Sequence, residues 1–206
     1  SSVNTDGSNP VRLTPSFTTP WLAMTHELGA DALAYGSYGQ SVELDAAPNL
    51  PQYSNAGQPL AALRSKQMEV GLKQHTGPVR WQLAWFDITR PQSGDAGECS
   101  AEASCLRQTD GQTHNRGLEL SGSYAQGPWL LHGSGAWIHS ERQNATIDPS
   151  VNWQRALNVP NVVVRALAQY RWANVPGLRT SLRLNHEGKR HVLEDGSLQL
   201  PAWTTL

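Results

Sequence analysis

The sequence has few of the residues that usually fill a protein core. Phenylalanine occurs twice in 206 residues and hydrophobic residues make up 38% of the chain, with a mean hydropathy of -0.47. No apolar run approaches the ~18 residues that a membrane-spanning helix needs, although that test does not detect spanning strands of ~9–11 alternating residues. The formal net charge of -1 gives no electrostatic reason to expect nucleic acid as a partner.

The sequence has only two cysteines, Cys99 and Cys105, in a polar stretch that contains glycine. A metal site needs more ligands, and a redox pair is more often Cys-x-x-Cys. We therefore expect a disulfide that closes a small surface loop, which implies an oxidising compartment.

Motifs of catalysis are also missing. The chain has no Gly-x-Ser-x-Gly, no phosphate-binding glycine loop and no paired carboxylates on a shared element. His132 and Ser134 share a strand parity, but that spacing is a common coincidence. The histidine pairs His186 with His191 and His132 with His139 do not make a ligand set. We expect neither an enzyme nor a metal site.

The sequence does contain segments in which apolar and polar residues alternate with a period of two. In residues 178–188 the leucines fall on one parity, and two arginines and an asparagine fall on the other. Successive side chains of a strand point to opposite faces, so this segment predicts a strand with one apolar and one polar face. The same alternation recurs in residues 68–73, 79–86, 118–124, 129–139 and 162–172. The fold class is therefore all-β, with about nine strands.

The predicted connections alternate between short and long, which favours an antiparallel up-and-down meander. The short ones contain glycine, as tight turns require, and are Leu28–Asp31, His75–Pro78, Ala125–Pro128 and Asn174–Gly177. The long ones are approximately Glu43–Leu63, Ile88–His114, Ser140–Val159 and Glu187–Gln199. In a meander, all tight turns then lie at one rim and all long loops at the other, as in bacterial outer-membrane barrels.

Eight tryptophans fit the same interpretation, because tryptophan favours a boundary between water and lipid. Trp81, Trp129 and Trp172 lie close to tight turns, and Trp137 lies toward the long loops. A soluble β-sandwich would use more Phe, Ile and Val inside and fewer charges on its second face. A barrel with a lipid-facing outside and a polar interior explains why one parity of each strand is apolar and the other is polar.

Four segments, in this order, resemble the TonB-dependent outer-membrane receptors, specifically the ferrisiderophore receptors. Asn49–Lys73 is similar to the family's long loop followed by a Gln-x-Glu-x-Gly-x-Lys strand, and His114–Gly122 to its Arg-Gly-x-Glu strand. Asn158–Pro160 matches the opening of the next strand, and Leu200–Leu206 the start of a late strand. The resemblance covers the chain from about Leu13.

The resemblance implies a 22-stranded transmembrane β-barrel in the outer membrane of a Gram-negative bacterium, plugged by an N-terminal domain that contacts TonB. Residues 1–206 would be a partial barrel domain, without the plug and the terminal strands. The expected partners are a ferric siderophore, outer-membrane lipid, the receptor's own plug and TonB. The siderophore is cargo, so no cofactor is expected.

Such receptors bind the iron chelate at the extracellular mouth, where aromatic faces and cationic donors recognise it. The residues of these types in or beside the expected long loops are Tyr53, Arg90, Arg107, His114, Arg142 and Trp153. The polar parity of the strands supplies a second set of charges, which we expect to form a mixed-charge barrel interior that contacts the plug and whose members pair with one another, namely Glu69, Lys73, Arg80, Glu119, Arg165, Arg171, Arg179 and Arg183.

Two alternatives remain open at this point: a passive porin or structural barrel, and a soluble β-rich binding module. A soluble module predicts a monomer without detergent, which neither barrel does. The polar residues at the start of the chain and the strand-like residues at its end lead us to interpret it as a piece of a longer polypeptide.

Overall fold

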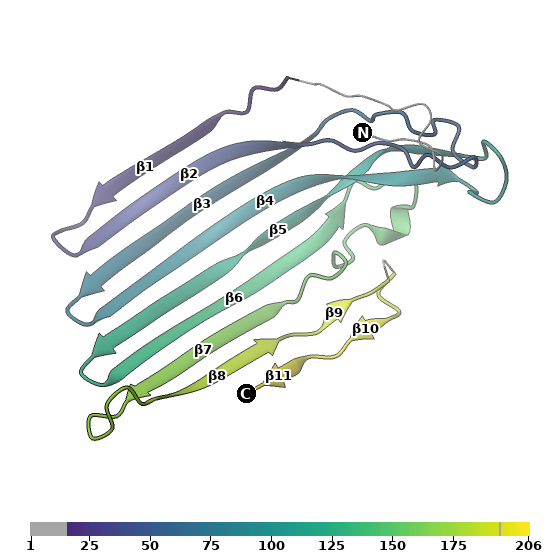
Figure 1. The fold of residues 1–206 in the computed structure, drawn as a ribbon. Coiled ribbons are helices and arrows are strands. Elements are labelled where there is room, and N and C mark those ends of the chain that lie inside the picture. Colours follow the sequence, from purple (N-terminus) through teal and green to yellow (C-terminus); the bar gives the residue numbers. More distant parts are fainter. Residues whose placement is uncertain (1–15, 194) are drawn as a thin grey trace.

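The computed structural model describes residues 16–193 and 195–206, and its main feature is one antiparallel sheet of nine strands. The sheet follows chain order throughout, β1-β2-β3-β4-β5-β6-β7-β8-β11, and β9 and β10 form a separate hairpin (Figure 1). The strands are β1 (Trp21–Glu27), β2 (Ala32–Glu43), β3 (Leu63–Thr76), β4 (Val79–Gly97), β5 (Cys105–Gln126), β6 (Trp129–Gln143), β7 (Val162–Arg171), β8 (Arg179–Glu187), β9 (Arg190–His191), β10 (Gln199–Leu200) and β11 (Trp203–Thr205). The predicted up-and-down meander is confirmed.

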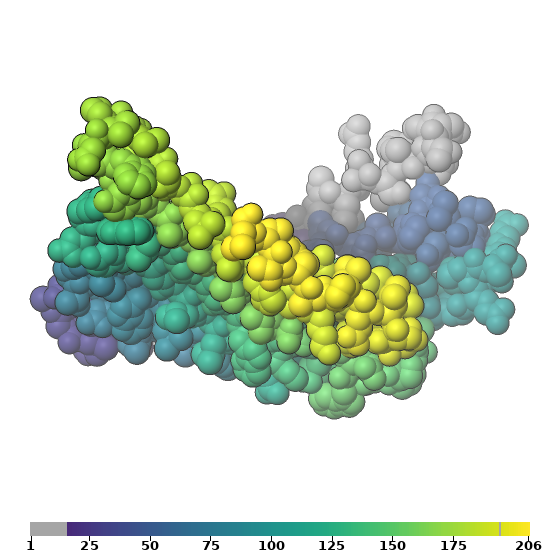
Figure 2. Space-filling view, turned by 90° about the horizontal axis from the view of Figure 1, so that it is seen from below, coloured from purple at the N-terminus to yellow at the C-terminus, as the bar shows by residue number. Residues whose placement is uncertain are grey.

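The tight turns and the long connections lie at opposite ends of the sheet, as expected. In Figure 1 the turns β1–β2, β3–β4, β5–β6 and β7–β8 share one end, here called the turn end. The opposite end, the loop end, holds the β2–β3 loop, the β4–β5 tip and the β6–β7 connection with the short 3-10 helix Pro149–Val151. Figure 2 shows the β2–β3 loop and the β4–β5 tip gathered there, away from the β7–β8 turn.

Strand register keeps each parity on one face of the sheet. Val70 pairs with Trp85, Trp85 with Leu118, and Leu118 with Trp137, so one row of apolar side chains crosses four strands. We call this side the apolar face. The opposite side, the polar face, carries Glu119 and the other residues that the sequence predicted to lie on the polar side of each strand. A register slip of one residue would exchange the two faces, so this register fixes which side meets which solvent.

No second layer covers the apolar face in the described part of the chain. Leu120 is 54% exposed and Leu182 is 61% exposed, and no large side chain there is fully buried. A soluble domain buries such a face against a second layer, and a continuous exposed apolar surface marks contact with a partner or a membrane. The sheet therefore does not fit a self-contained sandwich.

The polar face is lined largely by small and polar side chains, and its aromatic rings lie over glycines. A Cβ added to Gly71 would meet the ring of Tyr35, and one added to Gly117 would meet the ring of Phe86 and the carbonyl of Trp137. The Tyr35 hydroxyl donates to Glu69 at 2.6 Å. Glycine is thus required at both positions, because the ring of a neighbouring strand occupies the space of a side chain.

The predicted long connection Ile88–His114 is wrong as a loop. Strand β4 continues to Gly97 and β5 begins at Cys105, so most of this stretch is a paired hairpin beyond the sheet. A register shift between Pro91 and Ser93 interrupts the alternation. Gly111, opposite that shift, has a φ of +65°. A bulge with an αL glycine breaks the period of two without ending the pairing, which hid this strand in the sequence.

Candidate functional site

The β4–β5 tip is closed by the predicted disulfide. Cys99 and Cys105 are bonded, with their Cα atoms 5.0 Å apart. Cys105 also lies beneath the β2–β3 loop, because its backbone N–H donates to Gln52 and its carbonyl accepts from the N–H of Ser54. The disulfide thus holds the part of β5 on which the neighbouring loop is seated.

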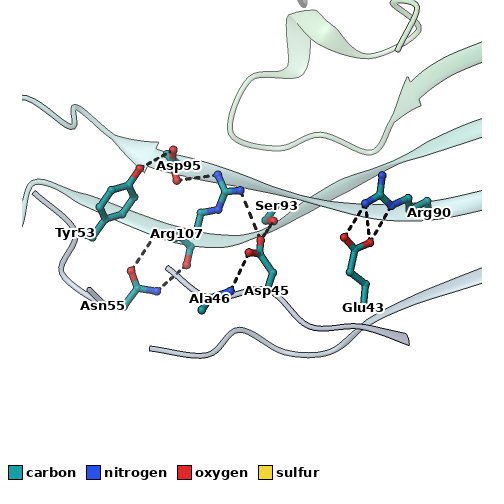
Figure 3. Close-up of polar contacts among 9 residues, drawn as sticks. All are labelled: Glu43, Asp45, Ala46, Tyr53, Asn55, Arg90, Ser93, Asp95 and Arg107. Atoms are coloured by element: carbon teal, nitrogen blue, oxygen red, sulfur yellow. Dashed lines mark hydrogen bonds and ion pairs between the residues drawn. The ribbon is translucent and has the colours of Figure 1, made fainter. Parts of the chain in front are cut away.

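A polar cluster joins the β2–β3 loop to this hairpin (Figure 3). The Tyr53 hydroxyl donates to Asp95 at 3.0 Å, and Arg107 contacts Asp95 at 3.2 Å and Asp45 at 3.6 Å. Asn55 completes the junction by bonding both the backbone N–H and the carbonyl of Arg107. Burial, together with the hydrogen bond to Asp95, raises the pKa of the Tyr53 phenol, so it remains a donor. Tyr53 and Arg107 therefore hold the loop in place.

Arg90 lies beside this cluster and is more accessible. Its guanidinium makes a bidentate contact with Glu43, the shortest distance being 2.7 Å, and the two side chains are 51% and 48% exposed. An exposed ion pair contributes only ~0–1 kcal/mol, so Arg90 can exchange Glu43 for another anion at low cost. The same hollow of the polar face is lined by Trp21, whose ring lies against Gly39 and is 73% exposed.

The β6–β7 connection is fixed by one buried carboxylate. Asp110 is 4% exposed and accepts from the backbone N–H and hydroxyl of Thr146, at 2.7 and 2.8 Å, and from the N–H of Ile147 at 3.2 Å. The guanidinium of Arg142, also buried, lies 3.9 Å from the carboxylate. Burial acts to raise the pKa of Asp110, but these donors and Arg142 outweigh it, so the pKa is lowered.

Trp153 is presented by this anchored connection. Its backbone N–H donates to the carbonyl of Arg142 at 2.8 Å, and its φ of +69° turns the chain at this point. The side chain is 73% exposed. A large aromatic ring held outward by an ordered backbone suits recognition of a planar or aromatic ligand at little entropic cost.

His114 lies within strand β5 and not in a loop. It pairs with Thr89 on β4 and with Glu141 on β6. These residues share the parity of Trp85 and Trp137, so they lie on the apolar side of the sheet, farther toward the loop end. Its ring contacts Asp87 at 2.8 Å and Glu141 at 3.9 Å. The position expected in a loop lies instead within a strand, and its parity directs it to the face opposite Arg90.

The six predicted binding residues thus separate into groups. Tyr53 and Arg107 share Asp95, Arg142 supports the backbone of Trp153, and Arg90 stands on the polar face. Trp21, which lines the same hollow as Arg90, was not among the predicted residues, because the alternation of its segment is ambiguous in phase. Among residues 16–193 and 195–206, no cluster of three or more metal-ligating side chains is found, and no helix is long and apolar enough to cross a membrane.

Comparison with known proteins decides what this sheet belongs to. The family model described as TonB dependent receptor-like, beta-barrel matches residues 1–206. The chain belongs to the TonB-dependent receptor β-barrel family. Proteins of this family lie in the outer membrane of Gram-negative bacteria.

Individual relatives agree with the family. The chain is 30% identical over 154 residues to the ferrichrome receptor FcuA of Yersinia enterocolitica, an alignment covering 74% of this chain and 19% of that protein. The ferric preacinetobactin receptor BauA of Acinetobacter baumannii aligns with a TM-score of 0.75 and 25% identity over 90% of this chain and 28% of that one. The ferric yersiniabactin uptake receptor FyuA of Yersinia pestis shares the fold, with a TM-score of 0.74, 20% identity and the same coverage of both chains.

The receptor segment therefore spans about a fifth of the curated relative and just over a quarter of the two solved receptors. The soluble-module alternative does not fit the single-layer sheet, and the family model that matches is that of a receptor-like barrel. The apolar alternation, the meander and the disulfide are confirmed.

Proposed function

We propose that residues 1–206 form part of the wall and mouth of a longer receptor that takes up ferric siderophores across the outer membrane in a TonB-dependent manner. The relatives named above are transport receptors, among them a ferrichrome receptor. The plug and the terminal strands of the barrel lie outside this segment, and TonB acts through the plug. The ferric chelate is cargo, and the protein needs no cofactor of its own.

The observation that carries this proposal is the exposed ring of Trp153 on an anchored backbone. Its ring is exposed at the loop end, while the backbone behind it is tied to Arg142 and, through the connection, to buried Asp110. The exchangeable Arg90–Glu43 pair and Trp21 lie on the polar face below the loops. An aromatic surface and a cationic fork are the groups that recognise a bulky chelate with anionic or hydroxyl-rich arms.

Replacing Trp153 with alanine is expected to weaken binding of the cognate ferric siderophore about tenfold or more, the size of effect typical of a central aromatic contact. The complete receptor, purified in detergent, would be titrated with a panel of ferric siderophores by tryptophan fluorescence. The midpoint is compared rather than the amplitude, because the variant lacks one fluorophore.

Trp172→Ala is the matched control. Trp172 follows β7 at the turn end and is 45% exposed, so its loss should leave the midpoint unchanged. Equal midpoints for wild type, Trp153→Ala and Trp172→Ala would remove Trp153 from the site. No saturable response to any ferric siderophore, in a folded receptor, would contradict the proposed substrate class.

His114→Ala is expected to leave siderophore affinity within about twofold of wild type, since surface changes away from a site are usually small. The His114 ring contacts Asp87 and Glu141 on the opposite face from Arg90. Isothermal titration calorimetry of both variants with the ferric siderophore tests this directly, because Arg90→Ala should weaken binding and His114→Ala should not. A larger loss in His114→Ala than in Arg90→Ala would mean that the assignment of faces is wrong.

A further inference from the structure

Two hollows in the apolar face join into one trench across β6, β7 and β8. The first has a volume of about 580 Å³ and the second, at the turn end, a volume of about 710 Å³, and Ala168 and Leu182 line both of them. We call the joined hollows the outer trench. Leu182 is 61% exposed, so the trench is open to whatever surrounds the sheet.

The floor of the outer trench is made of small residues. Gly122, Gly133 and Ala166 lie opposite one another in one row across β5, β6 and β7. A Cβ added to Gly133 would lie 4.0 Å from the Arg165 carbonyl oxygen, the nearest atom outside its chain neighbours, so the sheet itself does not require glycine there. The small floor leaves room for an apolar group from outside the chain.

An aromatic cluster closes the trench at the turn end. The ring centroids of Trp129 and Tyr170 are 4.8 Å apart and those of Tyr170 and Trp172 are 5.1 Å apart, both in edge-to-face geometry. The indole N–H of Trp172 donates to the Thr180 hydroxyl at 3.2 Å, which fixes that ring. Trp129 and Trp172 are 47% and 45% exposed, and no cation of the described residues lies over any of the three rings. Their faces are therefore available to a cation from outside.

The extent of the trench matches one leaflet of a membrane. Along β7 its lining runs from Ala166 to Trp172, six residues or about 20 Å. Strands of a membrane barrel tilt by about 35–45°, so this length covers about 15 Å of depth, half of a hydrocarbon core about 30 Å thick. An apolar trench of this depth with an aromatic rim suits the acyl chain of one lipid whose headgroup lies at the rings.

The rim of the trench indicates which headgroup it takes. The described residues that line the hollow at the turn end include no cation. Arg171 and Arg179 have the opposite parity and belong to the polar face, so the rim presents no fixed positive charge to a phosphate. Aromatic faces attract ammonium groups. This combination favours a lipid that ends in an ammonium group over a lipid with a net negative charge.

We propose that the outer trench binds one phospholipid of the membrane leaflet at the turn end, with an acyl chain over Gly133 and Ala166 and its headgroup ammonium against Trp129 and Tyr170. Proteins of this family lie in the outer membrane, which supplies such lipids. The inference goes beyond the proposed function, because it holds whatever cargo the receptor carries. The trench lies at the end opposite Trp153, so siderophore affinity should not depend on it.

Native mass spectrometry of the complete receptor tests the headgroup. The detergent-purified protein would be mixed with equal amounts of phosphatidylethanolamine and phosphatidylglycerol that carry identical acyl chains. One phosphatidylethanolamine should be retained, with about fivefold preference over phosphatidylglycerol. Trp129→Leu with Tyr170→Leu should abolish the preference, whereas Trp129→Phe with Tyr170→Phe, which keeps both rings, should preserve it.

A substitution in the floor tests the acyl chain separately. Gly133→Leu fills the trench and should lower the retention of both lipids severalfold. Gly135→Leu is the matched control, because Gly135 lies on the same strand and face but lines neither hollow, and its added Cβ would be 3.7 Å from the Val163 carbonyl oxygen. Glycine weakens the interior of a strand, so neither substitution should prevent folding, which circular dichroism checks.

Two results with the wild-type receptor would overturn the proposal. One is equal retention of the two lipids, and the other is a preference for phosphatidylglycerol, which would assign the contact to the phosphate. Unchanged retention in folded Gly133→Leu, or an unchanged preference in the folded leucine pair, would contradict it equally. The readout contains no siderophore, so its failure leaves the proposed function intact, and a receptor that binds no siderophore can still show the lipid preference.

Discussion

Replacing Leu120 with arginine is expected to destabilise the receptor by about 2–4 kcal/mol, the cost of a cation near the middle of the lipid-facing band of a barrel. Leu120 lies in a row with Leu83 and Gly135, two residues from Leu118 and far from both ends of β5. Its side chain is 54% exposed on the apolar face, so the arginine would meet lipid and have no partner there.

Ser121→Arg is the matched control, because the next residue along β5 points to the polar face. It pairs with Gln82 and Ser134, and arginine there joins a surface that already carries charge. Denaturant unfolding of both variants in lipid bilayers would give the comparison. Equal destabilisation of the two, or a larger loss in Ser121→Arg, would contradict the assignment of the faces.

Replacing Asp110 with alanine is expected to release the β6–β7 connection and to weaken siderophore binding about as much as Trp153→Ala does. The carboxylate accepts three hydrogen bonds from Thr146 and Ile147. Hydrogen bonds to charged groups contribute about 1.5–3 kcal/mol each, so local stability should fall by at least about 2 kcal/mol. Hydrogen exchange should show lost protection at Thr146 and Ile147.

The same carboxylate predicts a dependence on pH. The pKa of Asp110 is lowered in the folded protein, so its contribution is complete above the unfolded value of about 4 and is lost as the pH falls through the folded pKa. The protection factor of Thr146, which is its intrinsic exchange rate divided by the observed rate at the same pH, should therefore fall on acidification below pH ~4 in wild type and fall less in Asp110→Asn. Full protection in Asp110→Ala would show that other contacts hold the connection.

The faces of the sheet could be predicted from the sequence because a strand encodes them locally. Leu182 and Arg183 differ in parity, and register then aligns Leu182 with Ala168 and Arg183 with Leu167. The outer half of the β4–β5 hairpin could not be predicted in this way. Its pairing depends on contacts between residues distant in the sequence, and the shift at Pro91 removes the alternation that would have revealed it.

The side-chain contacts of the candidate residues could not be predicted from the sequence, for a related reason. Residue type singled out Trp153 and the arginines as candidates, but could not distinguish an exposed arginine from one that holds a loop. Arg107 is occupied by Asp45 and Asp95, contacts formed only after the β2–β3 loop folds onto β5. The register of β5 determines which face of the sheet His114 lies on, whereas its position in the sequence had suggested a loop.

Uptake of radiolabelled ferric siderophore by cells that express the complete receptor tests the central claim most directly. We predict saturable accumulation that requires both the receptor and TonB, reduced about tenfold at subsaturating siderophore in Trp153→Ala and unchanged in Trp172→Ala. Equal accumulation with and without the receptor, at confirmed surface expression and across the siderophore panel, would contradict the account.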